Sequence, residues 1–207
     1  MPSASAGSLA PGLTGWAGLA GRVAAGPVWL LGVRAIALAR PGLAEHDRRS
    51  AAGLGAITNP ALLDRLLDLP PGQPIGDPVV WAETSGLPAG IVDRGDDGYT
   101  VTRLLEPPLA LDGVVVPAGR AGVLRAVQDA SLFARFTWRW VAGTRPRIPR
   151  TAVLEAQLCG VGLLDPGGGV VLEAEPPRGL AVDEWSWLLQ EKTYRCWLRA
   201  EQERARP

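Results

Sequence analysis

The segment from residue 109 to residue 119, LALDGVVVPAG, contains two short apolar runs on either side of an Asp-Gly pair. Aspartate and glycine accept the positive φ angles of tight hairpin turns, and the valines that follow favour strands because they are β-branched. The pattern therefore predicts a β-hairpin in which Leu109–Leu111 pairs with Val114–Val116 across a turn at Asp112-Gly113.

Shorter runs of the same kind precede this hairpin along the chain. They are rich in β-branched and aromatic residues, as is typical of strands, and comprise Val79–Trp81, Ile91–Val92 and Tyr99–Thr102. The sequence GDDG at residues 95–98 predicts a tight turn between the last two runs. We therefore expect a small antiparallel β-meander over about residues 79–116.

Segments with helical periodicity lie on both sides of the predicted meander. Before it we expect helices over Val28–Ala39 and Ala44–Leu54, and a third that begins at Asn59-Pro60, with the asparagine as its cap. After it, one further strand is expected at Val170–Ala174, and the expected helices are Arg120–Ala142, Thr151–Gly160 and Asp183–Arg204. The predicted fold class is α+β: N-terminal helices, the meander, then C-terminal helices with one further strand.

The domain organisation follows from the length and from one linker. Residues 70–78 are rich in proline and glycine and separate the first helices from the meander. We expect a flexible tail over residues 1–11, an N-terminal helical part over 12–69 and an α+β part over 79–207. A chain of 207 residues is also of a size to form one continuous domain over 12–207.

The composition is that of an ordinary globular protein from a high-GC bacterium. The 21 basic residues, of which only Lys192 is a lysine, balance 21 acidic residues, so no global field draws the chain to nucleic acid or to an anionic membrane. Two cysteines and one histidine, His46, supply neither a disulfide scaffold nor the usual four zinc ligands. We expect a cytoplasmic protein with no metal and no cofactor.

An apolar stretch over residues 12–39 raises the question of a membrane. Arg22, Pro27 and Arg34 interrupt it, and neither half reaches the roughly 20 apolar residues of a spanning helix. Two buried helices are the favoured interpretation, and an interfacial segment is the alternative.

The segment from Phe133 to Thr151 is unusual because it interleaves arginine with aromatic residues and because the chain has no acid between Ser131 and Leu154. Guanidinium groups bind phosphate or carboxylate in a bidentate manner, and aromatic rings stack on bases. The residues predicted to bind a phosphate, another anion or a partner are Arg135, Trp138, Arg139, Arg145, Arg147 and Arg150. In the alternative interpretation, the aromatic residues form core and the arginines pair with acids of the same chain.

The last predicted helix carries aromatic residues on more than one face. A helix so broadly apolar lies deep in a core or binds a partner, and large aromatics anchor interfaces. The residues predicted to contact a partner are Trp185, Trp187, Tyr194 and Trp197.

The inventory for catalysis is poor. His46 lies in the charged run EHDRR, which is typical of a solvated helix start, and no nucleophile motif accompanies it. Turn formation explains the four aspartates that could form paired carboxylates, which are Asp93, Asp96, Asp97 and Asp112. No catalytic residue is assigned, and the balance is against an enzyme.

Three functions remain open from the sequence. The leading hypothesis is a non-enzymatic interaction or adaptor protein that presents the arginine-aromatic segment and the tryptophan-rich helix to a protein partner or to a second copy of itself. The second is a nucleic-acid-associated protein that contacts phosphates through Arg139–Arg150. The third is an enzyme of unrecognised chemistry with an arginine-lined pocket for an anionic ligand.

Overall fold

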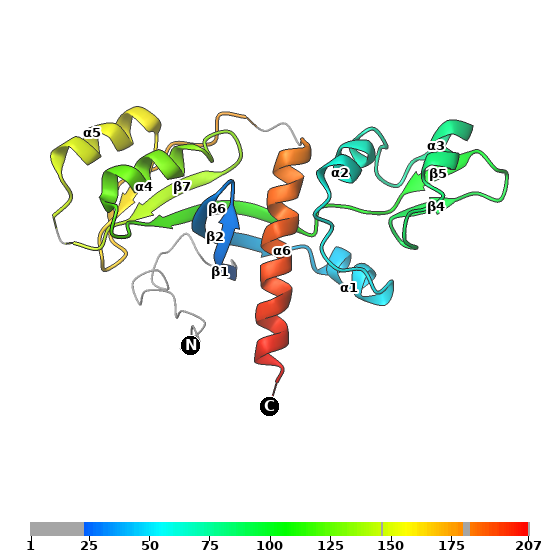
Figure 1. Ribbon diagram of the computed structural model, residues 1–207, viewed down its shortest axis with the longest axis horizontal. Helices are drawn as coiled ribbons and strands as arrows, with labels where there is room; N and C mark the ends of the chain where they lie inside the picture. The colour runs from blue at the N-terminus through cyan, green and yellow to red at the C-terminus, as the bar shows by residue number, and fades with distance from the viewer. Residues whose placement is uncertain (1–22, 146, 180–182, 207) are drawn as a thin grey trace. The chain divides into compact units, whose positions relative to one another are not determined.

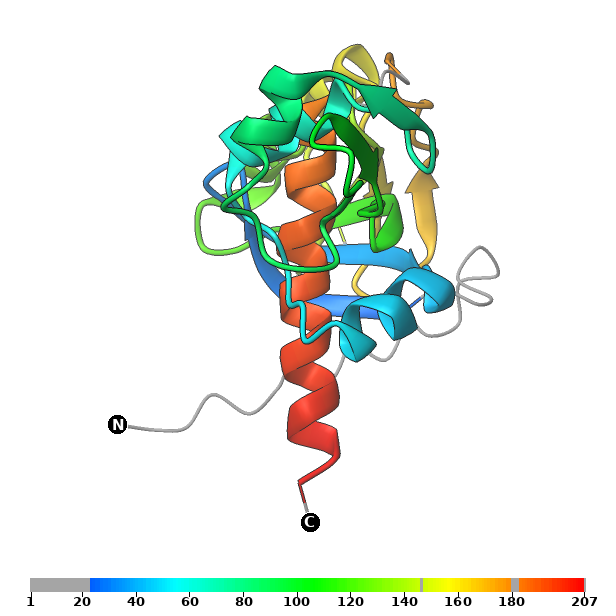
Figure 2. The same cartoon turned by 90° about the vertical axis from the view of Figure 1, so that its right-hand side faces the viewer.

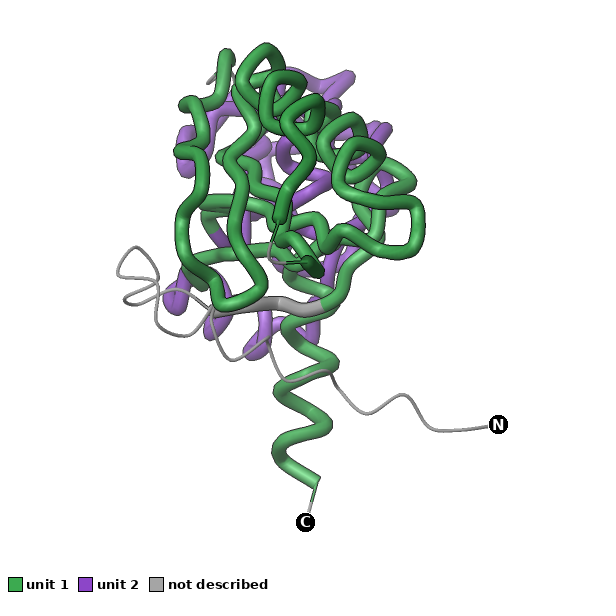
Figure 3. Tube along the Cα trace, turned by 90° about the vertical axis from the view of Figure 1, so that its left-hand side faces the viewer, with its two compact units in different colours: residues 1–41, 110–181, 192–207 green, residues 42–109, 182–191 purple. Residues whose placement is uncertain are grey.

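The computed structural model describes residues 23–145, 147–179 and 183–206 of the chain. They belong to two compact units, coloured separately in Figure 3. Unit 1 comprises residues 1–41, 110–181 and 192–207, and unit 2 comprises residues 42–109 and 182–191. The described residues form an α+β fold with nine strands and six helices, which confirms the predicted class, although the order of the elements differs from the prediction.

Unit 1 is built on a six-stranded mixed sheet with the strand order β1-β2-β6-β7-β8-β9. The strands are β1 (Val23–Leu30), β2 (Val33–Pro41), β6 (Leu109–Pro117), β7 (Trp138–Ala142), β8 (Gly162–Leu164) and β9 (Val170–Leu172). Strands β6, β7 and β8 are parallel to one another, while β1 pairs with β2 and β9 with β8 in the antiparallel sense.

The helix predicted over Val28–Ala39 is wrong, because this segment forms the β1–β2 hairpin. Leu31 and Gly32 make the turn with φ angles of 50° and 78°. Alternate residues on either side of it, among them Val28 and Ala35, are buried. The run is so uniformly apolar that its period does not distinguish a helix from a buried strand. Residues 1–11 and 12–22, for which a tail and the start of the N-terminal helices were expected, lie outside the described residues.

The hairpin predicted at Asp112-Gly113 is also wrong, because β6 runs through both residues as one strand. The Asp112 carboxylate accepts two hydrogen bonds from Arg40 of β2, at 2.8 and 2.9 Å. Gly113 makes room for Trp140 of β7, since a Cβ atom at this position would lie 2.6 Å from the indole ring. Both residues therefore make contacts with neighbouring strands of the sheet and do not form a turn.

Helices α4 (Gly122–Ser131) and α5 (Arg150–Cys159) connect β6 to β7 and β7 to β8. They pack against each other and lie together on one face of the sheet (Figure 1). The predicted helix over 120–142 is thus too long, because the chain leaves the helix after Ser131 and enters β7. Helix α5 agrees with its prediction. The strand β8 was not predicted.

Unit 2 contains α1 (Leu43–Ala51), α2 (Pro60–Leu67), α3 (Pro78–Glu83) and a three-stranded antiparallel sheet with the order β3-β5-β4. Its strands are β3 (Pro74–Gly76), β4 (Val92–Arg94) and β5 (Thr100–Arg103), and α3 packs against β5 (Figures 1 and 2). The predicted β4–β5 pair and the Asn59 cap of α2 are confirmed. The strand predicted at Val79–Trp81 is wrong: Asp77 caps these residues as a helix.

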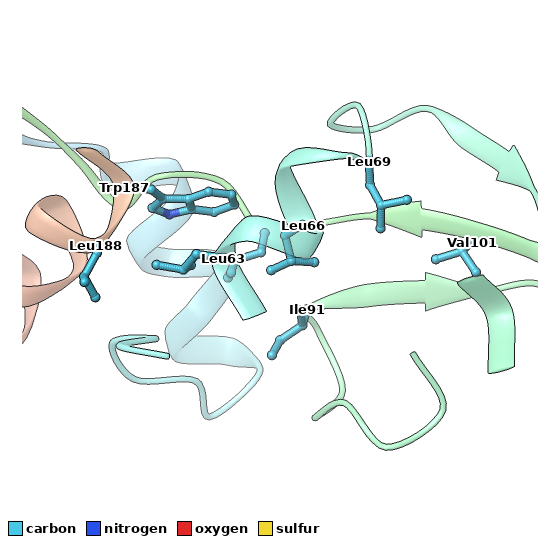
Figure 4. Packing of buried hydrophobic residues seen from close by; sticks show 8 residues of the cluster. Leu63, Leu66, Leu69, Ile91, Val101, Trp187 and Leu188 are labelled. Atoms are coloured by element: carbon cyan, nitrogen blue, oxygen red, sulfur yellow. The ribbon is translucent and has the colours of Figure 1, made fainter. Parts of the chain in front are cut away.

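The final helix, α6 (Glu184–Arg204), is a single unbroken element that matches its prediction (Figure 2). Its first turns belong to unit 2, where Trp187 and Leu188 join the core (Figure 4). The cluster also contains Leu63, Leu66, Leu69, Ile91, Val101 and Leu105. A search of the described part of the chain for a helix long and apolar enough to cross a membrane finds none.

A buried ion pair links α1 to α6 within unit 2. The Glu191 carboxylate accepts hydrogen bonds from both terminal nitrogens of Arg49, at 2.7 and 2.9 Å, from the Ile57 amide at 2.8 Å and from the Trp187 indole at 3.1 Å. Arg49 also donates to Glu45 at 2.7 Å. Burial disfavours the charged guanidinium, but the hydrogen bonds and charges of the two carboxylates outweigh it and raise the pKa of Arg49.

Candidate anion-binding site

The carboxyl ends of the parallel strands β6, β7 and β8 lie level with one another. Pro117 is in register with Ala142, and Ala142 with Leu164. Beyond these positions, the Ala118 amide donates to the Ala142 carbonyl and the Gly143 amide donates to the Leu164 carbonyl, each at 2.9 Å. The loops that follow the strands therefore begin at one edge of the sheet. Open sheets with parallel strands bind their ligands at this edge.

A hollow of about 610 Å³ lies at this edge. The loop after β6 and the start of α4 provide one part of its wall, and the loop after β7 provides the other; the lining residues are Ala118, Gly119, Arg120, Gly122, Val123, Thr144, Arg145, Arg147 and Pro149. The volume falls within the roughly 300–1,000 Å³ of small-molecule sites. By contrast, the loop after β8 closes on itself, because Asp165 accepts the amides of Gly167 and Gly169.

The three arginines of this hollow, Arg120, Arg145 and Arg147, are exposed. Within the described residues, no hydrogen bond, ion pair or ring contact engages any of them. The sequence explains the lack of neighbouring acids, since the chain has none between Asp112 and Asp129 or between Ser131 and Leu154. The hollow therefore carries a local positive charge on a chain whose net charge is zero.

Helices α4 and α5 both begin beside the hollow, with Gly122, Val123 and Pro149 in its wall. Neither helix has a side-chain cap, in contrast to α2 and α3, which are capped by Asn59 and Asp77. The first turns of α4 and α5 also contain no acidic residue. First-turn amides have no partner inside their helix and carry partial positive charge. The two helix starts therefore add to the field of the arginines.

The residues of the predicted arginine-aromatic segment are divided between several places. Arg145 and Arg147 line the hollow, and the exposed Arg150 begins α5. The guanidinium of Arg135 lies 5.1 Å from the centre of the Phe136 ring. Trp138 is 39% exposed and stacks on Trp140, with ring centres 6.1 Å apart.

Arg139 lies in the interior of unit 1. Its side chain is fully buried and donates to the Cys159 carbonyl at 2.8 Å and to the Glu175 carbonyl at 3.2 Å. Burial is the main cause that lowers the pKa of Arg139. The guanidinium binds the last carbonyl of α5, at the negative end of the helix dipole, and it is not exposed at the surface.

The aromatic residues predicted to contact a partner differ in exposure. Trp187 and Tyr194 are buried, and Trp197 is 8% exposed and stacks on Tyr194 with ring centres 5.6 Å apart. Trp185, at 45% exposure, is the one whose side chain is open to solvent. Partner contact through this helix stays a prediction, and Trp185 is the residue at which to test it.

No role for Arg120 was predicted from the sequence, although this residue lines the hollow together with Arg145 and Arg147. The parallel pairing of β6 and β7 brings Arg120 close to the loop after β7, whereas the hairpin predicted at Asp112-Gly113 does not include such a pairing. The small residues of Ala118–Gly122 directly after a strand were the available signal.

Across the described residues, no group of three or more His, Cys, Asp or Glu side chains is arranged to hold a metal ion. Comparisons of the chain with protein-family models, curated proteins and solved structures found no significant match.

Proposed function

We propose that this protein binds a small ligand that carries a phosphate or carboxylate group, in the hollow at the carboxyl ends of β6 and β7. The observation that carries the proposal is the grouping of Arg120, Arg145 and Arg147 around that hollow without an acidic partner among the described residues. A guanidinium is always charged in a protein, and its planar set of donors matches the oxygens of such groups.

The geometry assigns a role to each part of the wall. The arginines supply charge and directed hydrogen bonds. The starts of α4 and α5 add the partial positive charge of their first turns, although the Gly122 and Ala152 amides already donate to the Gly119 and Pro149 carbonyls. Thr144 adds a hydroxyl that can donate to an oxygen of the ligand. These groups bind an anion, and we assign no reaction to them.

A small ligand is favoured over a nucleic acid by charge and by size. The chain has as many acidic as basic residues, whereas nucleic-acid binding relies on many phosphate contacts. The hollow has the dimensions of a small-molecule site. Arg139, one of the arginines that the sequence predicts to contact nucleic-acid phosphates, is buried.

The test is thermal unfolding of the full chain with pyrophosphate and, separately, with citrate, at constant ionic strength. A ligand that binds the folded state raises its stability, by about 2.7 kcal/mol when its concentration is 100 times Kd. We expect at least one of the two anions to raise the Tm of the wild type, and we expect Arg145→Ala combined with Arg147→Ala to remove most of that rise.

The matched control is Arg204→Ala, which removes an exposed arginine at the end of α6, outside the hollow. It should leave the rise in Tm intact. The proposal fails if neither anion stabilises the wild type, or if the control variant loses the effect as fully as the double variant.

A further inference from the structure

A second hollow, of about 390 Å³, adjoins the first. The two share Gly119, Arg120 and Gly122 in their walls, so Arg120 stands between them. Beyond this shared wall the second hollow is lined by the tip of the β1–β2 hairpin, by the end of β6 and by residues of α4 between Arg125 and Asp129. All of these elements belong to unit 1.

The hairpin contributes Trp29, whose side chain is 68% exposed. Its neighbours in β1, Val28 and Leu30, are buried, so the alternation of the strand directs the indole away from the core. The two-residue turn at Leu31-Gly32 places Arg34 of β2 directly opposite Trp29. An exposed indole in the wall of a hollow presents a flat apolar surface on which a planar ring can stack.

Arg34 is exposed as well, and among the described residues its guanidinium has no hydrogen-bond or ion-pair partner. Arg125, at the other side of the hollow, is already paired with Asp129 at 3.0 Å. The second hollow thus combines an aromatic surface with two guanidinium groups that have no partner among the described residues, those of Arg34 and of the shared Arg120. The first combines three guanidinium groups with two helix starts.

We propose that the ligand is a nucleotide whose base stacks on Trp29 and whose phosphates lie among Arg120, Arg145 and Arg147. This inference rests on the proposed function, because it assigns the anion of the first hollow to the phosphates of a larger molecule. A nucleotide joins a planar ring to a polyanion through a short polar sugar, which matches the order of the two hollows. Arg34 faces the sugar or the edge of the base.

The test is isothermal titration calorimetry on the full chain with adenosine triphosphate and, in parallel, with inorganic tripolyphosphate, at constant ionic strength. Stacking of a base on an aromatic side chain corresponds to a change of about 5- to 150-fold in affinity when the ring is removed. We expect the nucleotide to bind more tightly than tripolyphosphate. We expect Trp29→Ala to remove that advantage and leave the affinity for tripolyphosphate unchanged.

Three variants complete the design. Trp29→Phe keeps an aromatic surface and should retain most of the advantage of the nucleotide. Trp185→Ala removes another exposed tryptophan, in unit 2, and should change neither affinity. Arg145→Ala combined with Arg147→Ala should lower the affinity for both the nucleotide and tripolyphosphate. Circular dichroism of each variant establishes that the fold is kept.

The outcomes separate this inference from the proposed function. If the nucleotide and tripolyphosphate bind equally well and Trp29→Ala changes neither affinity, the proposal of a nucleotide is overturned, while the proposal of anion binding is supported. If neither ligand binds, the nucleotide is overturned, and the proposed function then depends on whether pyrophosphate or citrate raises the Tm in the unfolding experiment above. If a single-stranded oligonucleotide binds more tightly than the mononucleotide and displaces it in a way that depends on Trp29, the ligand is a nucleic acid and the inference as stated is wrong.

Discussion

Arginine side chains occupy two different environments in this molecule. One group is buried and donates to carbonyl or carboxylate oxygens: Arg49, Arg103 and Arg139. A second group lines the two hollows of unit 1 and has no partner among the described residues: Arg34, Arg120, Arg145 and Arg147. A guanidinium remains charged in both environments. The buried arginines therefore form hydrogen bonds between separate chain segments, and the exposed arginines remain available to bind an anionic ligand.

Leu31 offers a test of the hairpin that positions Trp29. It adopts a φ of 50°, in the left-handed region that is costly for a leucine, beside Gly32 at 78°. Asparagine tolerates this conformation far better, and Asn-Gly is the preferred pair for such turns. We expect Leu31→Asn to raise the free energy of unfolding by about 1 kcal/mol, as measured by urea denaturation.

Leu31→Ala is the matched control for this change. Alanine pays the same backbone cost as leucine, so its free energy of unfolding should stay close to that of the wild type. An asparagine variant no more stable than the alanine variant would show that the turn is not strained.

At the scale of elements, the position of the candidate site depends on the three parallel strands and their two connecting helices. Trp140 of β7 packs where the neighbouring strands carry glycine, since a Cβ at Gly162 would lie 2.2 Å from its ring and one at Gly113 would lie 2.6 Å from it. The glycines that weaken β6 and β8 by propensity are therefore required by the packing of β7. This arrangement keeps the ends of the strands level, and hence the two arginine-bearing loops adjacent.

The α1–α6 ion pair supports a prediction of its own. Glu191 is fully buried, and its removal leaves Arg49 with one carboxylate and leaves the Ile57 amide without its acceptor. Breaking a buried pair by removing one member costs about 3–5 kcal/mol. We expect Glu191→Ala to lower the free energy of unfolding of unit 2 by this amount, as measured by native-state hydrogen exchange.

The double variant Arg49→Met with Glu191→Leu shows whether Glu191→Ala destabilises unit 2 through the unpaired charge of Arg49 or through the loss of packing. It removes both charges and fills the space with apolar atoms, so it should be more stable than the single Glu191→Ala variant. A double variant as unstable as the single one would mean that the cost does not come from an uncompensated charge.

For the whole molecule, Glu45 determines part of the response to acid. Burial of this carboxylate raises its pKa, but the hydrogen bonds from Arg48 and Arg49 outweigh burial, so the pKa of Glu45 is lower than its usual value. A lowered pKa adds stability above the unfolded value of about 4.3, and that stability is lost as the pH falls through the folded value.

We therefore expect the contribution of Glu45 to the free energy of unfolding of the wild type to decrease as the pH falls below about 4.3. Glu45→Gln should be less stable at neutral pH and should show a shallower decline in acid. Urea denaturation between pH 3 and 7 measures both curves. The control Glu203→Gln, at an exposed position near the end of α6, should follow the wild type.

The sequence was informative where local signals and tertiary structure agreed. The cap at Asn59, the GDDG turn and the periodicity of α5 and α6 all predicted elements that the structure contains. Long-range pairing overrode local signals elsewhere. A uniformly apolar run became the β1–β2 hairpin, and Asp112-Gly113 became the interior of a strand because of Arg40 and Trp140.

The candidate site was predictable in the same uneven way. Arg145 and Arg147 were found because an acid-free run of arginines before a helix is a visible pattern. Arg34, Arg120 and Trp29 are far apart in sequence, and only the strand order brings them to the same edge. No local pattern reports an adjacency of that kind.

Strands β2 and β6 are neighbours in the sheet, although the chain between them makes up most of unit 2. If the chain between β2 and β6 is unstructured, bringing these strands together costs conformational entropy, and this cost slows their pairing. The hydrogen bond from the Gly42 amide to the Pro108 carbonyl, at 2.9 Å, joins the two points where the chain enters and leaves that unit. Folding of residues 42–109 therefore brings the end of β2 close to the start of β6, and we expect pairing of these two strands to follow it.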